Sequence, residues 1–337
     1  MKNRNIGIDV LRIIACIGVI LLHVIGFKNK DLLIIYYLGT ISIPIFFMIS
    51  GYLICKKDLN YKYILNKVIN FILFVIIWSI IVSLLIFIHK HEIKFIDILL
   101  GTIIQKNLMG ILWFMWAICL MYLISPILQK IVLNKKASNI FLLICLAISE
   151  IVFFINIYSS LKYDILIVAK CPQILRIWTW ITYFYLGMYL NEKKAIVKNC
   201  KWGGMLLLII IMAIYEYLMG TLVMADARAE FFYDSLIVKV VVTYIFYFFT
   251  NKTNYNKVNI IERLALLTTG VYPIHFILLT IFNIIIKNDI YYIRLIELIG
   301  IVLLSFMICD IANKIPVLKW ITQTNYLSFS KKKNEQT

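Results

Sequence analysis

Charged residues are scarce in this chain of 337 residues. They make up 15% of it, whereas soluble domains carry about 25%, and apolar residues reach 63% with a mean hydropathy of +0.92. A soluble fold has too little interior to bury so many large apolar side chains. The composition therefore excludes an ordinary soluble protein and predicts an integral membrane protein.

Patterns that bind metals, disulfides or nucleotides are also missing from the sequence. The seven cysteines show neither the paired spacing of metal ligands nor a disulfide framework. The four histidines form no HExxH motif or similar cluster, and we find no glycine-rich phosphate loop. We therefore expect no bound metal or cofactor, and an ATP-driven pump is disfavoured.

Long apolar runs fill the sequence. A hydrocarbon core of about 30 Å takes roughly 20 apolar residues per helix, so the chain accommodates about ten spans. We expect an all-α, polytopic membrane helix bundle over residues 1–322, with no soluble domain, and a short polar cytoplasmic tail over 323–337. The predicted spans are 6–27, 36–55, 68–88, 108–129, 140–157, 174–190, 204–223, 236–250, 264–286 and 293–312.

The net charge of +17 is spread between the apolar blocks and is not gathered in one basic domain, which argues against a nucleic-acid partner. Cytoplasmic loops of membrane proteins accumulate Lys and Arg. If the N-terminus is cytoplasmic, most of the 34 Lys and Arg residues fall on that side. An even number of spans returns the C-terminus there. We expect a multi-pass cell-membrane protein with both termini in the cytoplasm.

The first predicted helix contains three ionisable residues, Asp9, Arg12 and His23. His23 follows Arg12 by eleven positions, which places both on one helix face about 16 Å apart along the axis. Asp9 lies one turn before Arg12, at a spacing that allows an ion pair. Such groups are costly in lipid and mark functional sites when they face the bundle interior. The alternative is that Asp9 and Arg12 only mark the cytoplasmic end of the helix.

A second histidine lies in the ninth predicted helix, where Tyr272 and Pro273 precede His275. A helical proline leaves a backbone carbonyl without its usual partner. Two histidines within the membrane form a candidate acid/base pair, because imidazole changes charge near neutral pH. By contrast, Ser50 and Gly51 in the second span are typical of close helix packing.

These segments together resemble the acyltransferase 3 family of bacterial membrane O-acyltransferases, which act on cell-envelope glycans. The first helix matches the family's Arg-x10-His motif through Arg12 and His23. The sequence departs from the family at two places. It has Lys62 and Lys67 where an arginine-rich run is usual, and it has Ile111 where a His commonly precedes Leu-Trp-Phe. The other similar segments are FFMISGYL (46–53), LWF (112–114), YLISPIL (122–128), YFYLGMYL (183–190) and GVYPIH (270–275).

The resemblance implies transfer of a small acyl group, acetyl from acetyl-CoA, to a hydroxyl of a cell-surface polysaccharide or its precursor. It implies His23 as base or transient acyl carrier, Arg12 as a donor contact and Asp9 as the residue that orients Arg12. Its other implied partners are the lipid bilayer and glycan-assembly proteins. The further site residues are Lys62 and Lys67 for the acyl-CoA, and Trp113, Tyr272 and His275 for the acceptor or its proton.

Two other functions fit the same residues. A non-enzymatic transporter or flippase for a glycan or its lipid-linked precursor also needs many helices and buried charges. A membrane subunit of a larger complex, with no chemistry of its own, is the third reading. Loss of a transporter strands glycan inside the cell, whereas loss of the enzyme leaves exported glycan without acyl groups.

Overall fold

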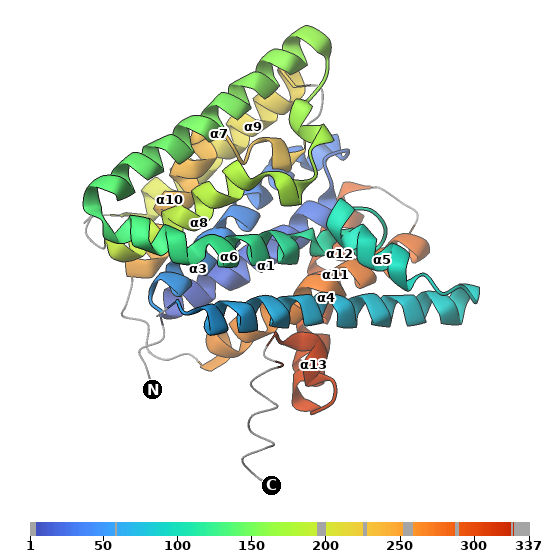
Figure 1. Cartoon of the computed structure of the whole chain (residues 1–337). Coiled ribbons are helices and arrows are strands. Elements are labelled where there is room, and N and C mark those ends of the chain that lie inside the picture. Colours follow the sequence, from blue (N-terminus) through green and yellow to red (C-terminus); the bar gives the residue numbers. More distant parts are fainter. Residues whose placement is uncertain are drawn as a thin grey trace.

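The computed structural model describes residues 5–57, 59–193, 200–224, 228–251, 259–286, 290–324 and 326. Over these residues the chain is helical, with no strand (Figure 1). The principal helices are α1 (Ile6–Ile25), α2 (Leu33–Leu38), α3 (Ser42–Cys55), α4 (Tyr61–Lys90), α5 (Phe95–Ile104), α6 (Trp113–Leu133), α7 (Lys135–Tyr163), α8 (Ile177–Glu192), α9 (Trp202–Leu222), α10 (Leu236–Asn251), α11 (Asn259–Ile285), α12 (Tyr291–Lys314) and α13 (Lys319–Thr322).

The predicted all-α membrane bundle is confirmed, but the number of spans differs. Among the described residues, eight helical segments are long and apolar enough to cross a membrane. The predicted spans 174–190 and 236–250 form α8 and α10, which have 16 residues each. Such helices are about 24 Å long, which falls short of a hydrocarbon core of about 30 Å.

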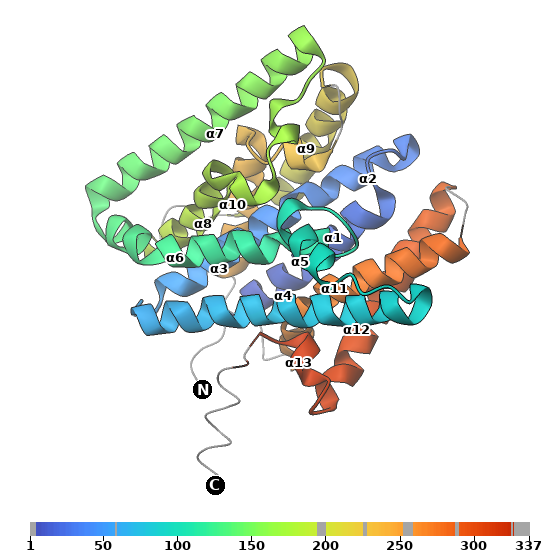
Figure 2. The same cartoon turned by 45° about the vertical axis from the view of Figure 1, so that its right-hand side comes forward.

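The helix α8 is short, yet it lies at the centre of one half of the bundle, packed against α3 (Figure 2). Two glycines make this crossing close. A Cβ atom on Gly51 would stand 1.9 Å from the carbonyl oxygen of Phe184, and one on Gly187 would stand 2.0 Å from that of Met48. Neither glycine can therefore carry a side chain unless the helices separate. The packing interpretation is confirmed for Gly51, whereas the Ser50 hydroxyl donates to the Phe46 carbonyl of its own helix.

The helix α1 begins with Asn5, whose side chain accepts a hydrogen bond from the Ile8 N–H, and ends at Gly26, which has a φ of 64°. Both are preferred helix boundaries. Between them α1 packs against α3, α10, α11 and α12. A Cβ on Gly18 would meet the Ser42 hydroxyl at 2.0 Å. Polar residues of α1 therefore face protein and internal cavities more than lipid.

The end of the described chain folds back against the bundle through α13. The Trp78 indole N–H donates to the Ile321 carbonyl at 3.1 Å, which ties α13 to α4. Gln323 and Thr324, the first residues of the predicted polar tail, follow directly. Apart from Tyr326, the remaining tail residues, including Lys331, Lys332 and Lys333, lie outside the described residues.

Candidate functional site

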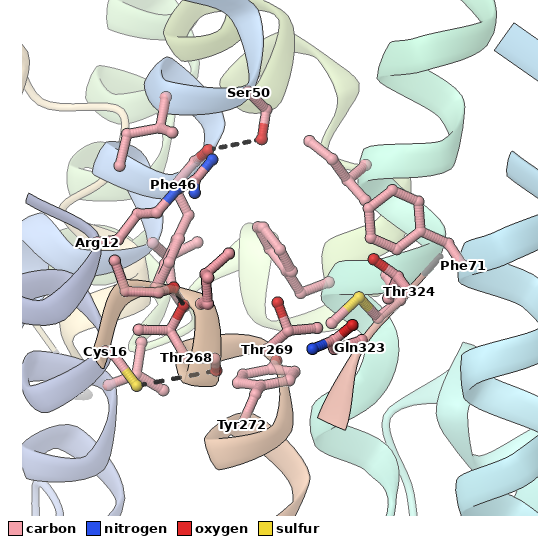
Figure 3. A pocket seen from close by; sticks show the side chains of 18 of the residues that line it. Arg12, Cys16, Phe46, Ser50, Phe71, Thr268, Thr269, Tyr272, Gln323 and Thr324 are labelled. Carbon is pink, nitrogen blue, oxygen red and sulfur yellow. Dashed lines mark hydrogen bonds between the residues drawn. The ribbon is translucent and has the colours of Figure 1, made fainter. Parts of the chain in front are cut away.

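A cavity of about 390 Å³ lies between α1, α3, α4, α6, α11 and the segment after α13 (Figure 3). We call it the Arg12 cavity. Its polar lining comes from residues far apart in sequence, and two of them, Arg12 and Lys67, are cations. No carboxylate belongs to its lining within the described part of the chain. The cavity therefore favours an anionic ligand.

Arg12 extends from α1 into this cavity (Figure 3). Its Nη1 atom lies 3.8 Å from a carboxylate oxygen of Asp9, one turn earlier, so the two residues form the predicted ion pair. The Asp9 side chain is buried, whereas that of Arg12 is 28% exposed. Asp9 thus holds Arg12 through the ion pair, and Arg12 lies in the lining of the cavity.

The two predicted lysines of α4 differ in position. Lys67 is half-buried and lines the Arg12 cavity, whereas Lys62 is exposed and does not belong to the lining. Five residues on a helix correspond to about 140° of rotation, so the two side chains leave α4 on different faces. Only Lys67 is placed to contact a ligand in this cavity.

Tyr272 and Trp113 are also separated by the fold. The Tyr272 ring lines the Arg12 cavity, and its hydroxyl donates to the Ile111 carbonyl, which ties α11 to the segment before α6. Trp113 is buried against Trp180, with ring centroids 5.1 Å apart, and does not line the cavity. Its neighbour Phe114 lines the cavity instead.

His275 is completely buried and lines the Arg12 cavity. Its Nδ1 atom lies 3.1 Å from the Val271 carbonyl oxygen. Because a carbonyl only accepts, Nδ1 carries the proton, and in the neutral ring Nε2 keeps its lone pair. Nε2 has no hydrogen-bond partner among the described residues. The neutral ring of His275 therefore keeps a lone pair on Nε2 inside the bundle.

The proline of α11 interrupts the helix hydrogen bonds beside the same cavity. Pro273 lacks the N–H that would bond the carbonyl of Thr269, four residues earlier. Thr269 itself lines the Arg12 cavity, and Figure 3 shows it beside Tyr272. The break in the helix ladder therefore falls at the cavity wall, two residues before His275.

His23 opens onto a different space. It is exposed and lines a second cavity of about 570 Å³, formed by residues 23–31 at the end of α1 together with Asn283 and Arg294. We call this the His23 cavity. Arg12 does not line it, and His23 does not line the Arg12 cavity. The two residues that share a face of α1 thus serve two separate cavities.

The two histidines, one from the lining of each cavity, are neighbours. Their ring centroids lie 5.5 Å apart, with 33° between the ring planes. His275 borders the Arg12 cavity and His23 borders the His23 cavity. The predicted acid/base pair is therefore brought together, at the point where the two spaces approach each other.

Several lining residues were not predicted. In the Arg12 cavity they include Ser50, Tyr122 and the tail residues Gln323 and Thr324. In the His23 cavity the main one is Arg294. Arg294 and Glu297 are charged residues inside an otherwise apolar span, and this pattern could have identified them as site residues from the sequence. Nothing in the local sequence distinguishes the others from ordinary packing residues.

Comparison with known proteins assigns this architecture to one family. A family model described as "Acyltransferase domain", of the acyltransferase 3 type, matches residues 5–314. That range contains all of the predicted site residues.

A serine/alanine racemase from Enterococcus gallinarum is 29% identical over 151 residues. The aligned region covers 42% of this chain and 21% of the racemase, so the match spans about a fifth of that protein. No solved structure matches the chain.

Proposed function

The chain belongs to the acyltransferase 3 family, and we propose that it is a cell-membrane O-acyltransferase. In this proposal it moves a small acyl group, acetyl from acetyl-CoA, onto a hydroxyl of a cell-surface polysaccharide or its precursor. The observation that carries the proposal is the His23–His275 pair, with one histidine on each of two cavities. Donor and acceptor then enter from opposite sides and meet at the histidines.

The Arg12 cavity is the proposed donor site, open to the cytoplasm, where acyl-CoA is available. Arg12 and Lys67 line it and would contact the phosphate groups of CoA. Guanidinium and ammonium groups form charge-assisted hydrogen bonds with phosphate. Asp9 holds Arg12 through their ion pair. The thioester would then lie deeper in the cavity, towards His275.

The proposed reaction begins when an acceptor hydroxyl enters the His23 cavity. His23 takes the hydroxyl proton while the oxygen forms an ester bond to the acyl carbon, and the carbon–sulfur bond to CoA breaks. The proton passes from His23 to Nε2 of His275 and then to the departing thiolate. Because the ring centroids lie 5.5 Å apart and Nε2 of His275 has no hydrogen-bond partner among the described residues, the proposed exchange passes through one bridging water. The products are the O-acyl glycan and free CoA.

The proposal predicts a specific change in surface glycan. We would measure the acyl content of this glycan by mass spectrometry in a strain lacking the gene, complemented with wild type or with His23→Ala. Wild type should restore the acyl mass and His23→Ala should not, at equal amounts of folded protein in the membrane. Full acylation with His23→Ala would contradict the assignment of His23.

The transporter alternative gives a different result in the same experiment. If the protein moves glycan, the strain lacking the gene should carry less glycan at its surface, with unchanged acylation per sugar. The enzyme proposal expects normal amounts of surface glycan without the acyl group. Measuring the amount of glycan together with its acyl content therefore separates the two functions.

A further inference from the structure

The His23 cavity gathers positive charge. Lys28, Lys30 and Arg294 line it, and Asp31 is the single carboxylate in its lining within the described residues. Lys28 and Lys30 are exposed. In the proposed orientation this cavity faces outward, where loops of membrane proteins are depleted in Lys and Arg. A concentration of cations beside His23 therefore runs against the general charge bias and indicates a ligand.

Arg294 is held in a fixed position at the wall of this cavity. Its Nη1 atom donates to the Asn283 side-chain oxygen at 2.9 Å and to a Glu297 carboxylate oxygen at 2.7 Å. The Glu297 side chain is fully buried, whereas 15% of the Arg294 side chain is exposed. A buried carboxylate is costly unless it is paired with a cation. Glu297 therefore fixes the guanidinium, whose planar fork suits carboxylate and phosphate groups.

We propose that the His23 cavity binds an acceptor glycan carrying a negatively charged group, a carboxylate or a phosphate, near the hydroxyl that receives the acyl group. This rests on the proposed function, in which His23 faces the acceptor. Arg294 anchors the anion, and Lys28 and Lys30 add attraction at the exposed rim. A field of this sign raises the local concentration of anionic substrates. The enzyme thus selects charged over neutral sugars.

Binding of defined oligosaccharides to the purified protein tests this directly. The probes are an oligogalacturonate, its carboxyl-reduced counterpart and a glycerol phosphate oligomer, measured by calorimetry in neutral detergent. We expect at least one anionic probe to bind about tenfold or more tightly than the reduced probe. The stronger anion identifies carboxylate or phosphate as the recognised group.

Substitutions locate the preference. Arg294→Gln and the double variant Lys28→Gln/Lys30→Gln should reduce the preference, Arg294→Gln most strongly. Lys170→Gln is the matched control, because Lys170 is exposed and does not line the cavity. The reduced probe serves as an internal reference, so a loss of folded protein does not mimic the result.

Equal binding of charged and reduced probes, or a preference that survives Arg294→Gln, would overturn the proposal. Binding of phosphatidylglycerol in place of both anionic probes would also overturn it. Transfer from labelled acetyl-CoA to the same probes is measured in parallel. Anion preference without transfer supports the binding site and counts against the proposed function, whereas transfer without preference does the reverse.

Discussion

The rings of His23 and His275 lie 5.5 Å apart, although the two residues come from opposite ends of the sequence and border different cavities. This contact brings a side chain of α1 and a side chain of α11 together. His275 adds a nitrogen with a lone pair, since its other nitrogen bonds the Val271 carbonyl. The proposed proton route therefore uses these two imidazoles in sequence.

The first prediction concerns His275. His275→Gln should lower the rate of acyl transfer roughly 100-fold to 10,000-fold, which is the usual contribution of a positioned acid or base. Binding of acetyl-CoA, measured by calorimetry, should change little. His91→Asn is the control, because His91 is exposed and has a φ of 56°, a conformation that Asn tolerates. Near-normal turnover by His275→Gln would remove His275 from the mechanism.

The second prediction separates Lys67 from Lys62. Lys67→Ala should raise KM for acetyl-CoA about tenfold, because it removes a cation from the Arg12 cavity. The value of kcat should change much less. Lys62→Ala, on another face of α4, should leave both constants unchanged. Steady-state kinetics in proteoliposomes measures both variants, and equal effects of the two substitutions would argue against a donor site in this cavity.

The third prediction tests the α3/α8 crossing. Gly51→Ala places a Cβ atom 1.9 Å from the backbone oxygen of Phe184, so the helices must move apart. Overpacking of this kind typically costs about 1–3 kcal/mol. Gly203→Ala is the control, because no atom lies within 4 Å of its added Cβ. Thermal unfolding in detergent should show a lower Tm for Gly51→Ala alone, and equal Tm values would mean that the crossing is looser than described.

The fourth prediction is a pH dependence of stability at Asp234, which precedes α10. Burial raises the pKa of Asp234 from 3.8 to about 6, although hydrogen bonds from Thr179 and Trp178 oppose the shift. Protonated Asp234 therefore makes its full contribution to the free energy of unfolding below pH 3.8, and this contribution is lost as pH rises through about 6. The difference corresponds to roughly 3 kcal/mol of unfolding free energy.

Asp234→Asn should flatten this dependence, because the amide does not ionise, although its single oxygen keeps only one of the two hydrogen bonds from Thr179 and Trp178. Wild-type Tm should fall mainly between pH 3.8 and about pH 6, and the variant's Tm should fall less. Asp164→Asn is the control, because Asp164 is exposed with a φ of 54°. Parallel pH profiles for wild type and Asp234→Asn would show that this carboxyl does not couple folding to pH.

Periodicity and composition predicted the parts of this structure that depend on one helix at a time. The long apolar helices follow from run length, and the Asp9–Arg12 ion pair follows from their spacing on α1. The helices α8 and α10 were predicted at 174–190 and 236–250, close to their observed bounds, but with 16 residues each they are shorter than a full span requires.

Features that depend on packing between helices could not be predicted from the sequence. The rotation of α4 decides that Lys67, and not Lys62, reaches the Arg12 cavity. The return of the chain through α13 brings Gln323 into the same lining. Trp113 and Phe114 are neighbours in a motif, yet only Phe114 borders the cavity. Each outcome depends on contacts between segments that are distant in sequence.

The most direct test of the central claim uses membrane vesicles of known orientation with glycan from a strain lacking the gene. Labelled acetyl-CoA is supplied on one face and glycan on the other. We predict label on the glycan only when acetyl-CoA is on the cytoplasmic face and glycan on the outer face, with wild type and not with His23→Ala. Transfer from acetyl-CoA on the outer face, or full transfer by His23→Ala, would contradict a path through the two cavities and the histidine pair.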